Sequence, residues 1–370
     1  MANLTDAMPD ELSTRHLRRG LLQLAGVGAV VVALVLIGPG LGSLRDRLSD
    51  ASPGWLVAAG VLELLSALSY IVVFRAVFCA KMSWRLSYQI GMSEQGANSL
   101  LPAGGAGGLA LGAWALNRGG MSAAHIGRRT VAFFLLTSLA NVGTLAVFSA
   151  LFASGVLSGD PDPALTYGFG VASLLAIVMT LCLPLLGARL APRTTPSDGA
   201  GRIRVASHHV RAAVGDGVRD SIVLLRRRPV GVLGGSFGYM AFDIAVLVCC
   251  FHAFGHSPAL PIVILAYIIG QLGGLIPLPG GIGGTEGGLI GTFALYNVPL
   301  APATVAVLTY RALALWLPAL LGSVAFVRLR ATLARETKPA AMCGELAAPL
   351  PSARRLARAR DRSPQTPIRS

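Results

Sequence analysis

Long apolar stretches without charged residues recur along the chain, and their lengths indicate membrane-spanning helices. The first runs from Gly20 to Gly38. A helix of that length extends about 28 Å, close to the thickness of a bilayer's hydrocarbon core. Basic residues precede it, as in a signal peptide, but the stretch is long and no good cleavage site follows, so we expect an uncleaved span. Five more stretches reach spanning length: Trp55–Cys79, Val131–Leu157, Leu165–Gly187, Gly231–Phe254 and Ala303–Val327.

Two further apolar segments are interrupted by glycine and proline. Leu86–Leu101 runs into PAGGAGG, and Ile262–Ile276 runs into PLPGGIGG, so neither arm reaches the length of a span. We therefore predict two re-entrant helical hairpins. Irregular backbone is not tolerated against lipid, so their tips must be buried in protein or face a polar cavity. The alternative is that glycine and proline serve only close packing between helices.

The two interrupted segments resemble each other and differ in their flanking charge. An offset of 176 residues places Gln95 on Gln271 and Gly105 on Gly281. Basic residues flank the first segment, whereas residues 255–302 contain no lysine or arginine. Because basic loops stay in the cytoplasm, the first hairpin would enter from the cytoplasm and the second from outside. This pattern predicts an inverted repeat, with irregular backbone near the membrane midplane.

Composition supports this fold class. The 370 residues are 54% hydrophobic and 13% charged, too apolar for a water-soluble core. We predict an all-α polytopic membrane protein with about six full transmembrane helices plus two re-entrant helical hairpins, or eight transmembrane segments. The net charge of +14 does not indicate nucleic-acid binding, because the basic residues flank apolar stretches and the positive-inside rule explains them.

The charge pattern also divides the chain. We expect a basic cytoplasmic tail at 1–19, one transmembrane domain at 20–328 and a disordered basic cytoplasmic tail at 329–370. The domain contains a cytoplasmic loop at 188–229 with nine arginines and three acidic residues. This loop would form a basic amphipathic helix against anionic headgroups, or a solvated linker whose charge only fixes topology.

Six charged residues fall inside the apolar segments: Glu63, Arg75, Glu94, Asp243, Glu286 and Arg311. A charge in hydrocarbon costs about 2.5–3.5 kcal/mol on insertion scales, so such residues pair or face a cavity. Glu286 directly follows the second glycine tip, where a half-helix would begin and the helix dipole favours an anion. Free N–H groups at such a tip also suit a phosphate.

The two arginines are the natural partners for a phosphodiester headgroup or for the acids. Alternatives remain for both of them. Arg75 lies near the end of its span and is able to snorkel to the interface, and Glu286 and Arg311 are able to form a purely structural pair.

Three sequence elements together resemble a known family. They are IPLPGGIGGTEGGL at 276–289, the later YRALALWLPALLG and the earlier NSLLPAGGAGG. They are similar to the lysylphosphatidylglycerol synthase transmembrane region family of flippase-like proteins, over roughly Leu21 to Arg328. In bifunctional members this region is the lipid-translocating half, joined to a cytosolic aminoacyl-transfer domain. Only a short basic tail follows here, so we expect no aminoacylation.

The resemblance also implies functional positions in both hairpins. The second hairpin and its downstream arginine match the family pattern well. The first departs from it, because Leu109 and Ala110 stand where a charged residue is expected after the glycines. The residues implied are Pro279, Gly280, Gly281, Gly283, Glu286 and Arg311, with Asn98, Pro102 and Gly105 in the first hairpin.

These observations predict a translocase for a lipid or lipid-linked headgroup, in the cytoplasmic membrane with both termini inside. A polyprenyl-phosphate-dependent transferase and a membrane scaffold in envelope synthesis are the alternatives. We expect no enzymatic activity, because the resemblance does not extend to an aminoacyl-transfer domain. We also expect no cofactor and no ATP-driven mechanism, because no phosphate loop, nucleophile elbow or metal cluster is evident. Membrane lipids with an anionic or phosphate-bearing headgroup are the expected partners, without nucleic acid; a second copy of the chain or an envelope-synthesis protein is a candidate partner. The candidate site comprises Glu286, Arg311, Pro279, Gly280, Gly281, Gly283, Arg75, Glu94, Asn98, Pro102, Gly105 and Asp243.

Overall fold

The structure of the chain is a computed structural model that describes residues 51–101, 106–154, 202–274 and 279–335, together with Leu22, Ala25 and Gly26. Within these ranges the protein is entirely helical, which confirms the all-α prediction. Three described helices are long and apolar enough to cross a membrane, namely α3 (Pro53–Phe78), α9 (Pro229–Ala253) and α12 (Leu300–Arg335). They coincide with three of the predicted spans.

The other predicted spans are covered in part. The helix α6 (Ala123–Ala153) includes most of the expected span at 131–157. The spans expected at 20–38 and 165–187 lie outside the described residues, apart from the three isolated positions named above. The disordered tail expected at 329–370 is instead helical at its start, because α12 continues to Arg335 before the described chain ends. The total of six spans therefore stays a prediction.

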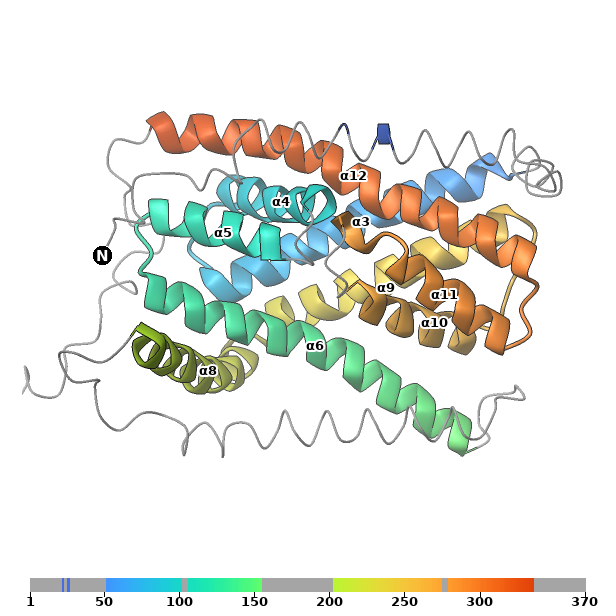
Figure 1. The fold of residues 1–370 in the computed structure, drawn as a ribbon, viewed down its shortest axis with the longest axis horizontal. Helices are drawn as coiled ribbons and strands as arrows, with labels where there is room; N and C mark the ends of the chain where they lie inside the picture. The colour runs from blue at the N-terminus through green and yellow to red at the C-terminus, as the bar shows by residue number, and fades with distance from the viewer. Residues whose placement is uncertain are drawn as a thin grey trace, which may run out of the picture.

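Both interrupted segments form helical hairpins. The first consists of α4 (Trp84–Leu100) and α5 (Ala106–Arg118), and the second of α10 (Leu260–Gly273) and α11 (Gly284–Leu295). The hairpins enter the bundle from opposite ends, between long helices that run lengthwise (Figure 1). A short 3₁₀ turn, η2 (Pro279–Gly281), lies between the arms of the second hairpin and contacts α4. The two hairpins therefore meet inside the bundle.

The two ends of the bundle differ in charge. The connection between α5 and α6 lies at one end, together with the junction between α9 and the helix α8 (Arg202–Arg227) (Figure 1). Arginines flank both places, so we call this the basic end. The connections from α9 to α10 and from α11 to α12 form the opposite end and contain no lysine or arginine. The basic loop expected at 188–229 thus contains a helix, and α8 packs against α6.

Apolar side chains cover much of the outer surface of the long helices. On α3, Val57 is 68% exposed and Leu68 is 49% exposed, and on α12 Val327 is 62% exposed. Exposure of this kind along whole helices would be unfavourable in water but suits contact with lipid tails. Inside, one buried apolar cluster surrounds the first hairpin and another surrounds the second.

Glycine allows the closest contact between α4 and α12. A β-carbon on Gly322 would lie 2.5 Å from the Met92 carbonyl oxygen and 2.6 Å from the α-carbon of Gly96. Backbone atoms at that distance cannot give way as a side chain could. The register of α12 on α4 is therefore fixed by two facing glycines. Four residues before Gly322, Pro318 lies inside α12 and interrupts its hydrogen-bond ladder.

This contact gives a first prediction. Gly322→Ala should lower the melting temperature of the detergent-purified protein, because overpacking in a close contact costs about 1–3 kcal/mol. Gly60→Ala is the matched control, since Gly60 is also within a helix and has nothing within 4 Å of a β-carbon. The control should leave the melting temperature unchanged or slightly higher. Equal melting temperatures for the two variants would show that α4 and α12 do not touch this closely.

Candidate substrate site between the hairpin tips

A polar cavity of about 310 Å³ lies where the two hairpins meet. Residues of α3, α4, α9, α10, η2, α11 and α12 form its wall. A cavity of this polarity, surrounded by helices with lipid-facing surfaces, requires water or a polar ligand inside it. Its polar lining residues are Glu63, Ser66, Tyr70, Gln95, Asn98, Ser99, Tyr239, Asp243, Gln271, Thr285, Tyr310 and Arg311.

The two glutamines paired by the sequence repeat both line this cavity. Gln95 comes from α4 and Gln271 from α10, so equivalent positions of the two hairpins contribute to one site. The side-chain nitrogen of Gln95 is buried and has no hydrogen-bond partner among the described residues. A buried amide in that state is available to donate to a ligand.

The tip of the second hairpin depends on glycine. Gly280, Gly281 and Gly283 have φ values of 59°, 66° and 87°, in the left-handed region that side chains disfavour. Space is also short, because a β-carbon on Gly280 would lie 2.4 Å from Leu315 Cδ2. Gly280 and Gly281 line the cavity, and Pro279 begins the turn. The backbone of η2 therefore forms part of the cavity wall.

An ion pair joins this tip to α12. Arg311 Nε donates to Glu286 Oε1 at 2.8 Å, and the same guanidinium donates to the Gly280 carbonyl oxygen. Glu286 Oε2 accepts a hydrogen bond of 2.6 Å from the Gly283 N–H. The expectation that free N–H groups at this tip receive a phosphate is thus corrected at Gly283, because Glu286 caps its own helix there.

Arg311 and Glu286 differ in their relation to the cavity. Arg311 lines it, whereas Glu286 does not. An arginine has five N–H donors, and the contacts with Glu286 and Gly280 use two of them, so the rest can reach a ligand. Arg311 is therefore the member of the pair that faces the cavity, and Glu286 holds its guanidinium from outside the cavity wall.

Two carboxyl groups lie in the same cavity. Asp243 Oδ2 accepts hydrogen bonds from Tyr267 at 2.8 Å and from Tyr310 at 3.1 Å. Asp243 Oδ1 and Glu63 Oε2 are buried and have no hydrogen-bond partner among the described residues. An unpartnered buried carboxyl oxygen requires a proton, or a hydrogen-bond donor from water or a ligand. The site therefore combines one guanidinium with two incompletely bonded acids.

Glu63 was absent from the candidate site derived from the sequence, although its position inside an apolar span was the available signal. Asp243 was in that set because of the same signal. Nothing in the sequence indicates that α3 and α9 turn these two acids toward one cavity. Close packing of α9 on α3 sets the orientation of the two helices, because a β-carbon on Gly235 of α9 would lie 2.6 Å from the Val73 nitrogen of α3.

Among the other candidate residues, Pro279 and Gly283 belong to the hairpin tip without lining the cavity, and neither Arg75 nor Glu94 lines it. Arg75 Nε donates to the Met82 carbonyl at 2.7 Å, and its guanidinium lies 4.4 Å from the centre of the Trp84 ring. Arg75 is twelve residues beyond Glu63 on α3, about 18 Å along the helix, which explains its absence from the cavity. It secures the α3–α4 connection instead.

Glu94 is buried and joins the first hairpin to α3. Its Oε2 accepts a hydrogen bond of 2.9 Å from the Tyr70 hydroxyl. It lies so close to α5 that a β-carbon on Gly112 would overlap its carboxylate. Asn98 does line the cavity, and its Oδ1 accepts from the Gly108 N–H at 2.8 Å, which joins the two arms. Pro102 and Gly105, also candidates, lie outside the described residues.

The described residues contain no group of three or more histidine, cysteine, aspartate or glutamate side chains suited to a metal ion. Fold and site together define a class: a polytopic helical membrane protein in which two opposed hairpins enclose a polar cavity. The family described as lysylphosphatidylglycerol synthase TM region matches residues 21–322. The chain therefore belongs to that family, as its motifs indicated.

Two relatives of this chain have the same name. A UPF0104 membrane protein of Methanothermobacter thermautotrophicus (strain ATCC 29096 / DSM 1053 / JCM 10044 / NBRC 100330 / Delta H) is 25% identical over 331 residues, which cover 82% of this chain and 94% of that protein. A second match of the same name and organism is 37% identical over 94 residues, covering 25% of this chain and 26% of that protein. This chain is thus an integral, multi-pass membrane protein, and the first of these relatives aligns with it over almost its own full length.

Proposed function

We propose that this protein moves the headgroup of a phosphate-bearing lipid across the membrane through the cavity between the hairpin tips. The observation that carries the proposal is the polar cavity at the meeting point of two half-length hairpins, with Arg311 in its wall. In transporters with inverted repeats, broken helices of this kind line the substrate site at the midplane. A lipid headgroup is the polar substrate that a lipid-facing bundle meets in both leaflets.

The lining suggests how a headgroup would be held. The planar guanidinium of Arg311 matches the oxygens of a phosphodiester, and Glu286 fixes its orientation. Asp243 Oδ1 and Glu63 Oε2 would accept either a headgroup amine or a proton. Such a site would bind a lipid whose headgroup has both a phosphate and an amine without further help. A lipid without an amine would bind together with a proton on one of the acids. We propose transport without any covalent change to the lipid.

Reconstituted vesicles test this proposal. The purified protein is placed in vesicles that contain traces of phosphatidylglycerol or phosphatidylethanolamine with a fluorescent acyl chain, so that the headgroup stays native. External dithionite bleaches only the outer leaflet of protein-free vesicles and should bleach both leaflets when the protein is active. Bleaching limited to the outer leaflet for both lipids would contradict the proposal. Mass spectrometry of the recovered lipid would reveal any covalent change and thereby favour a transferase.

Orientation is part of the same proposal and gives a second prediction. In a cysteine-free background, Ser257→Cys at the opposite end should react with an impermeant maleimide added to intact cells. Ala123→Cys at the basic end should react only after permeabilisation, because basic ends stay in the cytoplasm. Both positions are exposed in the structure, so burial does not protect either cysteine from the reagent. Labelling of both from one side would exclude hairpins of opposite entry.

A further inference from the structure

A second cavity, of about 130 Å³, lies at the basic end of the bundle and shares no residue with the first. It is formed where α3 leads into the α3–α4 connection, against the first turns of α6 and the end of α8. Its charged or titratable lining is Lys81, His125, Arg129, Arg227 and Arg228, and its apolar wall includes Val77, Phe78, Val223 and Leu224. Among the residues that the structure describes, no acid lines this cavity.

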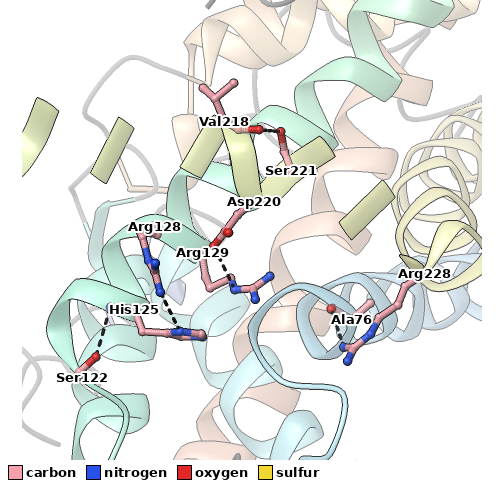
Figure 2. A network of polar contacts seen from close by, with 9 residues as sticks. All are labelled: Ala76, Ser122, His125, Arg128, Arg129, Val218, Asp220, Ser221 and Arg228. Carbon is pink, nitrogen blue, oxygen red and sulfur yellow. Dashed lines mark hydrogen bonds and ion pairs between the residues drawn. The ribbon is translucent and has the colours of Figure 1, made fainter. Parts of the chain in front are cut away.

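Several polar contacts hold the basic groups around this cavity (Figure 2). Arg228 donates to the Ala76 carbonyl at 3.2 Å, which ties the α8–α9 junction to α3. Arg129 Nε lies 3.5 Å from Asp220 Oδ2, an ion pair between α6 and α8 in which both side chains are about four-fifths buried. The cavity is therefore built from segments that are fixed to one another, although they are far apart in sequence.

Counted over the described residues alone, the charges around the cavity are not balanced. Four lining side chains are cationic, and Asp220, the acid that pairs with Arg129, neutralises only one of them. Burial, together with the charges of Arg129 and Arg128, lowers the pKa of His125, so this histidine is neutral at pH 7. Its Nδ1 lies 3.4 Å from an Arg128 nitrogen, a geometry that suits the neutral ring as acceptor. An unbalanced positive group of this kind favours a bound anion.

The surroundings indicate which anion. Ile222 and Val223 of α8 are each 40% exposed, and Trp84 is 57% exposed beside the same connection. Exposed apolar and aromatic side chains next to basic ones are typical of the membrane interface. A phosphate group attached to an apolar chain would therefore satisfy both the cationic rim and the apolar wall.

We propose that this cavity binds the phosphate of an anionic phospholipid from the leaflet at the basic end, where it holds α8 against α3 and α6. The site is separate from the transport cavity, and the proposal does not depend on transport. Lys81 and Arg227 would contact the phosphate, because neither is used in the contacts that fix Arg129 and Arg228. Inorganic phosphate has the same charged group, so the two sources must be separated by experiment.

The test measures the melting temperature of the purified full chain in mixed micelles. Added phosphatidylglycerol should raise it in a saturable way, whereas added phosphatidylcholine should not. Lys81→Gln/Arg227→Gln should raise the half-saturating concentration of phosphatidylglycerol by about tenfold or more, since each charge-assisted hydrogen bond is worth roughly that factor. Arg227→Gln alone should show a smaller shift in the same direction, which keeps the test valid if the double variant is poorly folded.

The control removes the same charge from the same region. Arg219→Gln/Arg226→Gln changes two exposed arginines of α8 that do not line the cavity, and it should keep the wild-type response. A control that loses as much as the cavity variant would overturn the site and leave only general electrostatic attraction. An equal response to phosphatidylcholine would overturn it too. If inorganic phosphate raises the melting temperature as much as phosphatidylglycerol does, and phosphatidylglycerol then adds nothing further, the assignment to a lipid would be overturned.

Discussion

Arg311→Ala should lower lipid translocation in vesicles by a factor of about 30 or more, because truncating one partner of a buried charge pair costs about 2–5 kcal/mol. The guanidinium lines the cavity and carries the phosphate contact in the proposed function. Its removal also leaves Glu286 without its ion-pair partner. Rates are compared per reconstituted protein, with membrane abundance measured in parallel, and abundance should stay near that of the wild type.

The double variant Glu286→Gln/Arg311→Leu separates a functional role from a purely structural one. It removes both charges, so it relieves the unpaired carboxylate that Arg311→Ala leaves behind. If the pair serves transport, the double variant has normal abundance and no transport. If the pair serves stability alone, the single variants should be depleted from the membrane, and their transport should scale with the protein that remains. The double variant should then recover both abundance and transport.

Asp243→Asn and Glu63→Gln should each reduce translocation by about tenfold or more, the value of one charge-assisted hydrogen bond. Asparagine retains an oxygen to accept from Tyr267 and Tyr310, so the first variant removes charge with little change in packing. Both acids face the cavity with an unpartnered oxygen. Translocation is measured in the same vesicles and at the same protein density as the wild type.

Glu94→Gln provides the matched control for these acids. Glu94 is as deeply buried as Glu63, but it contacts Tyr70 and does not line the cavity. Transport should therefore survive this change. Equal losses of transport in Glu94→Gln and Asp243→Asn would show that buried acids are required for folding in general. The position of Asp243 in the cavity would then be no evidence for a role in transport. Transport that is unaffected by Asp243→Asn and Glu63→Gln would exclude a role for the two acids.

The choice of lipid then reveals what the acids bind. If they accept a headgroup amine, Asp243→Asn should impair phosphatidylethanolamine more than phosphatidylglycerol. If they accept a proton, both lipids should be impaired equally, and transport by the wild type should respond to a pH gradient. The two results distinguish a specificity role from a coupling role at the same pair of oxygens.

The hairpins could be predicted from the sequence because a broken apolar segment leaves few physical alternatives in lipid. The repeat offset also paired Gln95 with Gln271, which do meet at one cavity. The rotation of each helix about its axis could not be predicted. On α4, Gln95 and Asn98 line the cavity, yet Glu94, the acid that the sequence singled out there, does not. Close contacts such as that of Gly235 with Val73 set this rotation, and a single sequence does not show which glycines touch.

At the basic end, the sequence predicted the positive charge but not the second cavity. A run of arginines indicates a side of the membrane, whereas the second cavity depends on how α8 packs on α6. Lys81, Arg129 and Arg227 are separated by 48 residues or more in sequence, and only the tertiary structure brings them to one place.

Pro318 makes α12 easier to bend at one point than elsewhere along its length. A proline has no N–H, so the Ala314 carbonyl loses its helical hydrogen bond at a point where both residues line the cavity. Before this point the helix carries Tyr310 and Arg311, and after it Gly322 is locked against Gly96. Bending stiffness is therefore lowest between the segment that holds the substrate contacts and the segment anchored to α4. A bend at Pro318 would displace Arg311, and the hairpin tip bonded to it, while the anchored segment stays in place.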